Sequence, residues 1–388
     1  MKKICMIIPK NLPLPATKGG AIETLITNVI NENEMEKKID LTVVSVYDPE
    51  AYKRSKNYQN TKFIYINSRK MSYKLKALWY FLLKKIHIPR NTYNDIILQK
   101  IKNEKYDYII AEDGAYDFFN KYLKYFPKEK MVLHLHHTIE TTKNIEKTFD
   151  KIITVSNYVK NVFAKNSLIK NIYVLPNAVD IANFTKKLND EEKINLKKSL
   201  HIKKDDYVLI YCGRLASEKG IIELVKAVNN LKLNKIKLMI VGSINFAENG
   251  TNKYTNDLQL EAIKKNRVIF TGYVPNELLY KYYDIADLMV IPSICEEAAG
   301  LVCIEGMLSR IPIITTGNGG IKEYVKNYAI YVNTNNIIKD LEEKINYCYH
   351  NQSIILEKVN NAYKHALQYS THNYFNNLVK IIEKEFKK

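Results

Sequence analysis

Short apolar runs alternate with amphipathic stretches along the whole chain. Runs of this length, rich in valine and isoleucine and separated by stretches of helical period, are typical of βα units on parallel sheets. The pattern therefore predicts an α/β fold. In the first half of the chain the predicted strands are Lys3–Ile8, Leu41–Val46, Phe63–Ile66, Tyr108–Ala111, Met131–Leu135, Lys151–Val155 and Ile172–Leu175. In the second half they are Tyr207–Cys212, Lys237–Val241, Val268–Phe270, Leu288–Ile291 and Ile311–Thr315.

The two series of strands predict two domains, and 388 residues are about right for two α/β domains. Between the series lies a charge-rich stretch without a predicted strand, 190–206, which we interpret as a surface segment joining the domains. We place the N-terminal domain at 1–178 and the C-terminal domain at 179–371. A helix at 372–388, whose apolar positions recur with helical period, is expected to complete the first domain.

Composition narrows the class of protein. The formal net charge is +18, from 59 Lys and Arg against 41 Asp and Glu, which predicts an anionic partner. The charge is spread widely, and no module appears that carries basic residues interleaved with stacking aromatics on one face, so we expect no nucleic acid partner. Five cysteines without a CxxC pair favour reduced thiols in the cytoplasm over a zinc site or disulfides.

The apolar run at the start ends at Pro9, too early for a signal peptide, and no apolar stretch approaches the ~20 residues of a membrane span.

Glycine marks the first candidate site. Only 13 residues are glycine, and most of them follow the end of an apolar run, where open α/β sheets bind ligands. One such segment, Gly213–Gly220, follows a predicted strand and opens a helix. Its Arg214 and Lys219 suit a diphosphate, because a helix N-terminus and two cations attract the same anion. Taken alone, the motif fits solvated surface cations equally well.

A second segment, 291–305, combines a strand end, a loop with carboxylates and a helix that begins near Gly300. The first N–H groups of that helix, at Gly300, Leu301 and Val302, would face an anion. Glu305, one turn into the helix, could accept hydrogen bonds from paired hydroxyls such as those of a ribose. Glu297, in the loop, could contact a polyol. The alternatives are a helix-dipole carboxylate for Glu297 and a solvated helix face for Glu305, although apolar neighbours make full exposure of Glu305 less favourable.

These segments resemble a known family. Glu297 and Glu305 are separated by seven residues, which resembles the E-x7-E pattern of retaining family 4 glycosyltransferases. Gly213-Arg214 with Glu218-Lys219-Gly220 is similar to the family's G-R-x-x-x-x-K-G segment, and Gly19-Gly20-Ala21 to its N-terminal Gly-Gly loop. Similar motifs follow in order along almost the whole chain. The N-terminal segment most resembles enzymes of capsule, lipopolysaccharide or spore-coat polysaccharide assembly.

The resemblance implies a GT-B fold, with two Rossmann-like domains facing across a cleft. The N-terminal domain would bind the acceptor, a glycan or lipid-linked oligosaccharide, and the C-terminal domain the nucleotide sugar, in the first place a UDP-sugar. The implied activity is retaining hexosyl transfer without metal or other cofactor, which the absence of an Asp-x-Asp triplet also favours. The implied donor-site residues are Arg214 and Lys219 with Gly213 at the diphosphate, Glu305 at the ribose, Val274 at the base, Gly300, Leu301 and Val302 at the diphosphate and sugar, Glu297 at the sugar, and Gly19 and Gly20 over the phosphates.

A histidine-rich strand end adds a further candidate. In this family a histidine at the corresponding strand end lies close to the transferred sugar, and here the register leaves both His136 and His137 open, with His136 favoured. His134 is expected to be a core residue. Ala298-Ala299 stand where the family often has a bulky residue, so the donor sugar stays undetermined. A GT-B epimerase is the alternative enzyme.

The stretch 69–90 contains seven Lys and Arg, no Asp or Glu, and the only tryptophan, Trp79. Apolar residues at helical spacing with lysines around them are typical of a helix on an anionic membrane surface. The alternative is a helix that packs on the N-terminal sheet and has a solvated basic face. Membrane contact would make this a cytoplasmic protein that is peripheral on the inner face of the plasma membrane. The apolar positions are Leu75, Leu78, Trp79, Leu82 and Ile86, and the lysines are Lys74, Lys76, Lys84 and Lys85.

Overall fold

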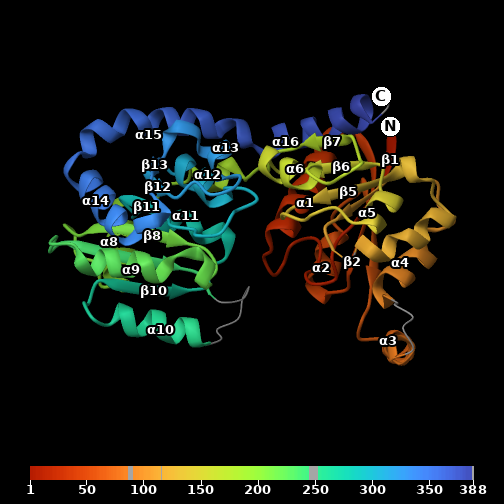
Figure 1. Cartoon of the computed structure of the whole chain (residues 1–388), viewed down its shortest axis with the longest axis horizontal. Coiled ribbons are helices and arrows are strands. Elements are labelled where there is room, and N and C mark those ends of the chain that lie inside the picture. Colours follow the sequence, from red (N-terminus) through yellow and green to blue (C-terminus); the bar gives the residue numbers. More distant parts are fainter. Residues whose placement is uncertain (86–90, 115, 244–251, 387–388) are drawn as a thin grey trace. The chain divides into compact units, whose positions relative to one another are not determined.

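The computed structural model describes residues 1–85, 91–114, 116–243 and 252–386. It divides the chain into two compact units (Figure 1). Unit 1 contains Met1–Asn177 together with the C-terminal segment that begins at Thr371, and unit 2 contains Ala178–Ser370. In the described ranges, no helix is both long enough and apolar enough to span a bilayer.

Unit 1 is built on a parallel sheet with the strand order β3-β2-β1-β4-β5-β6-β7. The chain moves outward from β1 to β3, returns to β4 and then moves outward in the other direction, which is the doubly wound pattern. The strands are β1 (Lys2–Ile7), β2 (Ile39–Val46), β3 (Thr61–Ile66), β4 (Tyr108–Glu112), β5 (Met131–Leu135), β6 (Lys151–Thr154) and β7 (Asn171–Val174). The helices are α1 (Ala21–Glu36), α2 (Pro49–Ser55), α3 (Met71–Lys85), α4 (Thr92–Ile101), α5 (Lys143–Thr148), α6 (Asn157–Ala164) and α16 (Thr371–Lys380).

Unit 2 repeats this plan with the strand order β10-β9-β8-β11-β12-β13. Its strands are β8 (Tyr207–Cys212), β9 (Ile236–Val241), β10 (Val268–Gly272), β11 (Leu288–Ile291), β12 (Ile313–Thr315) and β13 (Ile330–Tyr331). The helices are α7 (Ile181–Phe184), α8 (Asp190–Ser199), α9 (Ile221–Asn230), α10 (Lys253–Ala262), α11 (Leu279–Tyr283), α12 (Leu301–Leu308), α13 (Ile321–Val325), α14 (Ile337–His350) and α15 (Gln352–Ala366).

Both faces of the second sheet are buried. Along β8, Val208 and Ile210 belong to one hydrophobic cluster, whereas Leu209 and Tyr211 belong to the other. Because successive side chains of a strand point to opposite faces, a strand covered on both sides reads as a continuous apolar run. The prediction of two Rossmann-like domains with parallel sheets is therefore confirmed.

The interpretation of 190–206 as a joining segment is wrong. Its first half is α8, which lies within unit 2, and the boundary between the units falls earlier, at Asn177 and Ala178. Asn189 and Glu192 form a capping box that starts this helix, and none of its residues is buried. The C-terminal segment packs as expected, since Tyr374, Phe375, Leu378, Ile381 and Ile382 are buried and α16 lies against α1 in unit 1 (Figure 1).

Candidate active site

The two candidate segments of unit 2 follow neighbouring strands. β8 and β11 pair in parallel at the point where the strand order reverses, so their carboxyl ends lie side by side. Gly213–Gly220 follows β8, and the loop that leads to α12 follows β11. In open α/β sheets this switch point is where ligands bind. The topology therefore brings together two motifs that are about eighty residues apart in the sequence.

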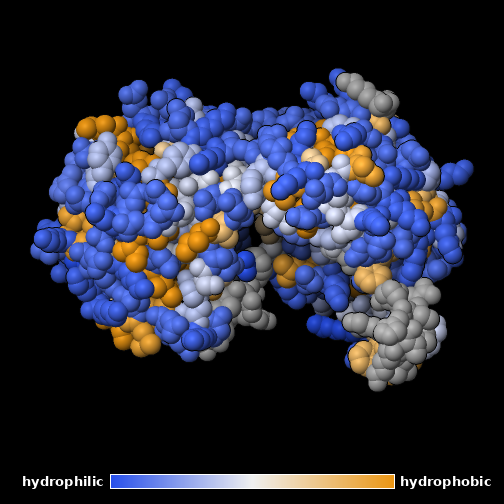
Figure 2. Space-filling view, in the orientation of Figure 1, coloured by the Kyte–Doolittle hydropathy of each residue, from blue (hydrophilic) through white to orange (hydrophobic). Residues whose placement is uncertain are grey.

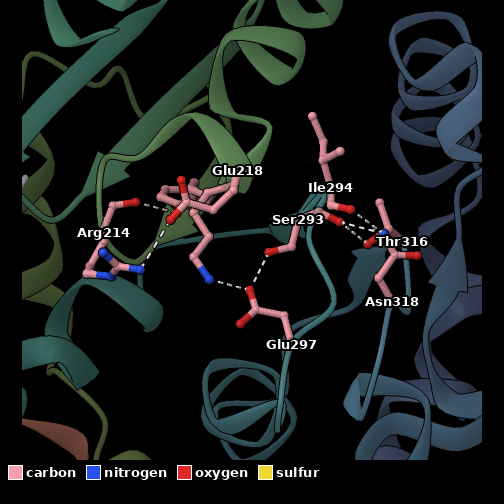
Figure 3. Close-up of polar contacts among 9 residues, drawn as sticks. Arg214, Glu218, Ser293, Ile294, Glu297, Thr316 and Asn318 are labelled. Carbon is pink, nitrogen blue, oxygen red and sulfur yellow. Dashed lines mark hydrogen bonds and ion pairs between the residues drawn. The ribbon is translucent and has the colours of Figure 1, made fainter. Parts of the chain in front are cut away.

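An ion pair joins the two segments. Lys219 Nζ lies 2.5 Å from Glu297 Oε1, and the Ser293 hydroxyl donates to the same carboxylate oxygen at 2.7 Å (Figure 3). The side chains of Lys219 and Glu297 are only 15% and 22% exposed, so water screens their attraction weakly. The site thus contains a mostly buried lysine, Lys219, that is paired with a carboxylate of the loop before α12.

The loop that carries Glu297 is held rigidly. The carbonyl of Glu218 accepts hydrogen bonds from the backbone N–H groups of Ile294 and Cys295, at 2.9 and 3.1 Å. Thr316 donates its hydroxyl to the carbonyl of Ser293 at 2.6 Å, and the Asn318 amide donates to the carbonyls of Ser293 and Ile294 (Figure 3). Preorganised groups of this kind need little rearrangement when a ligand arrives.

Gly220 shows why the first segment needs its last glycine. Its φ is +67°, and a Cβ at this position would lie 2.2 Å from the carbonyl oxygen of Pro292. Any other residue would therefore be strained and would push the two segments apart. The glycine permits the contact between the β8 segment and the β11 loop.

Arg214 lies in the same segment but has a different partner. Its guanidinium is 3.3 Å from Glu218 Oε1, and the side chain is about half exposed (Figure 3). Exposed pairs of this kind contribute little to stability. The structure thus brings Lys219 and Glu297 together. Arg214 pairs with Glu218 instead, and Gly213 lies directly after β8.

α12 supplies the remaining predicted groups of unit 2. Gly300 is its N-cap residue and has no side chain that could cap the first N–H groups, at Leu301 and Val302. Glu305 is buried, contrary to the alternative of a solvated helix face, and accepts a hydrogen bond from the Tyr283 hydroxyl at 2.6 Å. Burial raises the pKa of Glu305 to about 7, and the bond from Tyr283 offsets only part of that rise. Val274 lies just beyond β10 and packs on the core of this unit.

Unit 1 gathers its predicted residues in the same way. The Gly19-Gly20 loop lies between β1 and α1, and His136 follows β5, close to the switch point between β1 and β4. Gly20 has a φ of +95°, and a Cβ there would lie 2.1 Å from Glu23 Oε2. Glu23 is itself buried and close enough to His136 to affect its pKa.

Carboxylates hold the histidine cluster of unit 1. Glu112, at the end of β4, places Oε2 2.8 Å from both His134 Nδ1 and His136 Nε2. Asp113 accepts from His137 Nδ1 at 2.9 Å, while His137 Nε2 lies 2.9 Å from the Tyr116 hydroxyl. His134 is buried, as expected.

Glu112, His134 and His136 are the one group in the described part of the chain whose spacing could bring three ligands to a metal ion. Ligands at about 2.1 Å in a tetrahedral zinc site lie roughly 3.4 Å from one another. The carboxylate oxygen is 2.8 Å from each of the two ring nitrogens, which is the distance of a hydrogen bond. The geometry therefore fits shared protons better than an ion.

Residues that the sequence analysis did not select complete both sites. In unit 2 they are Ser293, Tyr283, Thr316 and Asn318. Nothing in the sequence distinguishes Tyr283 from the other 28 tyrosines. In unit 1, Glu112 and Asp113 directly follow a predicted strand, and that position was a usable signal.

The chain is similar to known glycosyltransferases in sequence and in fold. Residues 192–368 match the family of group 1 glycosyl transferases. Lipopolysaccharide 1,2-N-acetylglucosaminetransferase of Salmonella typhimurium is 26% identical over 329 residues, 84% of this chain and 83% of that protein. Among solved structures, a glycosyltransferase from Rickettsia africae has a TM-score of 0.77 at 20% identity, covering 100% of this chain and 99% of that one. Anabaena HepE in complex with UDP and glucose has a TM-score of 0.74 at 17% identity, covering 99% and 100%. Residues 192–368 thus form a group 1 glycosyl transferase domain, and the chain as a whole has the GT-B fold.

Proposed function

We propose that this protein transfers a hexose from a nucleotide sugar, a UDP-sugar, to a glycan or lipid-linked acceptor during cell-surface polysaccharide synthesis, with retention of configuration. The observation that carries the proposal is the Lys219–Glu297 pair at the switch point of unit 2, beside the open N-terminus of α12. The name of the Salmonella relative supports a polysaccharide acceptor. The UDP and glucose bound by HepE support the donor.

The chemistry of the donor explains these residues. Breaking the anomeric bond develops negative charge on the departing diphosphate. Lys219 and the N–H groups of Leu301 and Val302 are positive partners for that charge, and such groups act most strongly where water is excluded. In this proposal Arg214 adds a second cation by leaving Glu218, and Glu305 accepts from the ribose hydroxyls.

Without donor, Glu297 neutralises Lys219. We infer that the diphosphate replaces Glu297 as the partner of Lys219 and that the released carboxylate accepts hydrogen bonds from the sugar hydroxyls. Ser293 keeps Glu297 oriented during this exchange because it donates to the same oxygen atom. In unit 1 the proposal assigns His136 a hydrogen bond to the transferred sugar, and Gly19 and Gly20 the phosphates. A phosphate oxygen takes the acceptor proton on the same face, so no side chain acts as general base.

The donor and the metal independence are tested together. We expect a UDP-sugar to raise the melting temperature of the purified protein more than GDP- and ADP-sugars do, with the same shift in EDTA. A ligand at a hundred times its Kd stabilises the folded state by about 2.7 kcal/mol, which is several degrees. A shift that requires a divalent ion, or one given only by GDP- or ADP-sugars, would contradict the proposal. Product analysis separates transfer from the epimerase alternative, because an epimerase changes the nucleotide sugar without an acceptor.

We further propose that α3 contacts an anionic membrane. Its apolar residues Met71, Leu75, Leu78, Trp79 and Phe81 are 57% to 69% exposed. Lysines in the same segment lie among them, and apolar side chains reach the surface in the part of unit 1 that carries this helix (Figure 2). This exposure supports membrane contact over packing on the sheet. Ile86 and the side chains of Leu82, Lys84 and Lys85 lie outside the described residues.

Trp79 makes this contact measurable, because it is the only tryptophan. We expect its fluorescence to shift to the blue with phosphatidylglycerol vesicles, to shift little with phosphatidylcholine vesicles, and to return as salt is added. Leu75→Glu with Leu78→Glu should remove the shift. Leu260→Glu, which changes an exposed leucine of unit 2, is the matched control and should keep it. Equal shifts with both lipids, or none, would count against the membrane surface.

A further inference from the structure

Glu112 is a fully buried carboxylate with an unusual set of partners. It is the last residue of β4 and pairs with His134 of β5, so the register of the sheet places it next to His134 and close to His136. Its Oε2 atom is 2.8 Å from a ring nitrogen of both His134 and His136. Burial alone would raise the pKa of Glu112, but the two imidazoles lower it to about 2, so the carboxylate is ionised. An ionised carboxylate only accepts hydrogen bonds, and therefore both facing ring nitrogens carry protons.

This arrangement determines which atom of His136 is available. Nε2–H is held by Glu112, whereas Nδ1 has no hydrogen-bond partner among the described residues. His137 differs, because Asp113 and Tyr116 occupy both of its ring nitrogens. Of the two histidines between which the sequence could not decide, His136 is thus the one with a free nitrogen.

The backbone of the cluster is held as firmly as the rings. Asp113 has a φ of +51°, a left-handed conformation that is uncommon for residues other than glycine. In this conformation its carboxylate accepts from the backbone N–H of His136 at 3.0 Å, while its own N–H donates to the carbonyl of His134 at 2.9 Å. Such local strain persists where surrounding contacts impose it, and it concentrates at functional sites.

A contribution to stability does not by itself explain why these polar groups are buried. Glu112 Oε1 and His134 Nε2 are buried and have no hydrogen-bond partner among the residues that the structure describes. Buried charged groups with unsatisfied atoms are costly, and apolar side chains of similar volume often serve stability better. A role in holding His136 accounts for this cost.

We propose that Glu112 is a positioning residue for sugar transfer: it keeps the proton on Nε2 of His136 and thereby presents Nδ1 to the substrate. The proposal rests on the proposed function, in which His136 meets the transferred sugar. It assigns Glu112 no contact with substrate. A buried carboxylate has the same role in a catalytic triad, where it fixes the tautomer of the histidine that acts as general base.

The test is Glu112→Gln, which keeps the shape and removes the charge. A glutamine amide can place its one acceptor oxygen where Oε2 stands, but that oxygen carries no charge, so it holds both imidazole N–H groups more weakly than the carboxylate does. We expect kcat to fall about 10- to 100-fold, the cost typical of losing a group that orients a functional histidine, with the donor KM nearly unchanged. In ¹H–¹⁵N spectra of the histidine side chains, assigned with His136→Asn, part of the His136 population should move from the Nε2–H form to the Nδ1–H form, because the neutral oxygen fixes the ring proton less firmly.

Glu32→Gln is the matched control. Glu32 is also a buried carboxylate of unit 1 next to a histidine, His372. It should change neither kcat nor the His136 spectrum. An unchanged His136 tautomer or an unchanged kcat in Glu112→Gln would overturn the proposal, as would a stoichiometric metal ion in the wild-type protein that this variant loses. If the wild-type protein transfers no sugar, the proposed function fails, and the spectra alone decide whether Glu112 sets the tautomer.

Discussion

Lys219→Ala should lower kcat about 10²- to 10³-fold, the usual cost of removing one preorganised donor to a developing anion. The side chain is mostly buried beside Glu297, so its charge acts where water is scarce. Its loss also leaves Glu297 as an unpaired carboxylate near the place where the diphosphate would bind, which adds repulsion. The measurement is a steady-state assay with purified protein, varying the donor at saturating acceptor.

The control for this substitution is Lys264→Ala. Lys264 is a lysine of the same unit that pairs with Glu261 at the surface, and its side chain is 62% exposed. Its removal should leave kcat unchanged, because exposed pairs contribute little. Near-normal turnover in Lys219→Ala would remove the diphosphate site from unit 2.

Glu305→Gln should make the protein more stable and a poorer binder of its donor. Burial raises the pKa of Glu305 to about 7 from its usual value of 4.5. Between these two values the folded state binds a proton that the unfolded state has lost, so the stability contributed by this group falls as pH rises. A shift of this size corresponds to roughly 3 kcal/mol above pH 7, and the neutral glutamine avoids that cost. Thermal unfolding should therefore show a gain for the variant at about pH 8 that disappears near pH 4.

Donor affinity should rise with pH, whereas the stability that Glu305 contributes falls. The ionised carboxylate accepts from ribose hydroxyls more strongly than the protonated group, which keeps less acceptor capacity, so the wild-type Kd for UDP-glucose should rise as pH falls below about 7, by up to tenfold per unit. In Glu305→Gln we expect about 10-fold weaker binding at about pH 8, consistent with the loss of charge-assisted hydrogen bonds, and a flat profile. Calorimetry across this range decides, and an equal slope in both proteins would exclude Glu305 from ribose binding.

Much of the fold was readable from the sequence because it depends on local pattern. Met131–Leu135, Tyr207–Cys212 and Leu288–Ile291 form strands with the predicted bounds. Each is a short and mostly apolar run, of the kind that a sheet covered on both faces requires. β13, a strand of two residues, is too short for such a pattern. The charged stretch that became α8 has a capping box but no buried residue, and Leu196 is its one side chain among the partly buried apolar residues that pack on the described core of unit 2.

The sequence by itself determined which chemical groups stand at the ends of the strands, since a motif such as Gly213–Gly220 is contiguous. Only the tertiary structure decided their partners. Lys219 meets Glu297 across 78 positions, and Glu112 meets His136 across 24. Both contacts exist because parallel pairing places the ends of β8 beside β11, and of β4 beside β5. Spacing along a chain sets the face to which a side chain points, but the neighbouring strand, chosen by the packing of the whole sheet, sets what it touches.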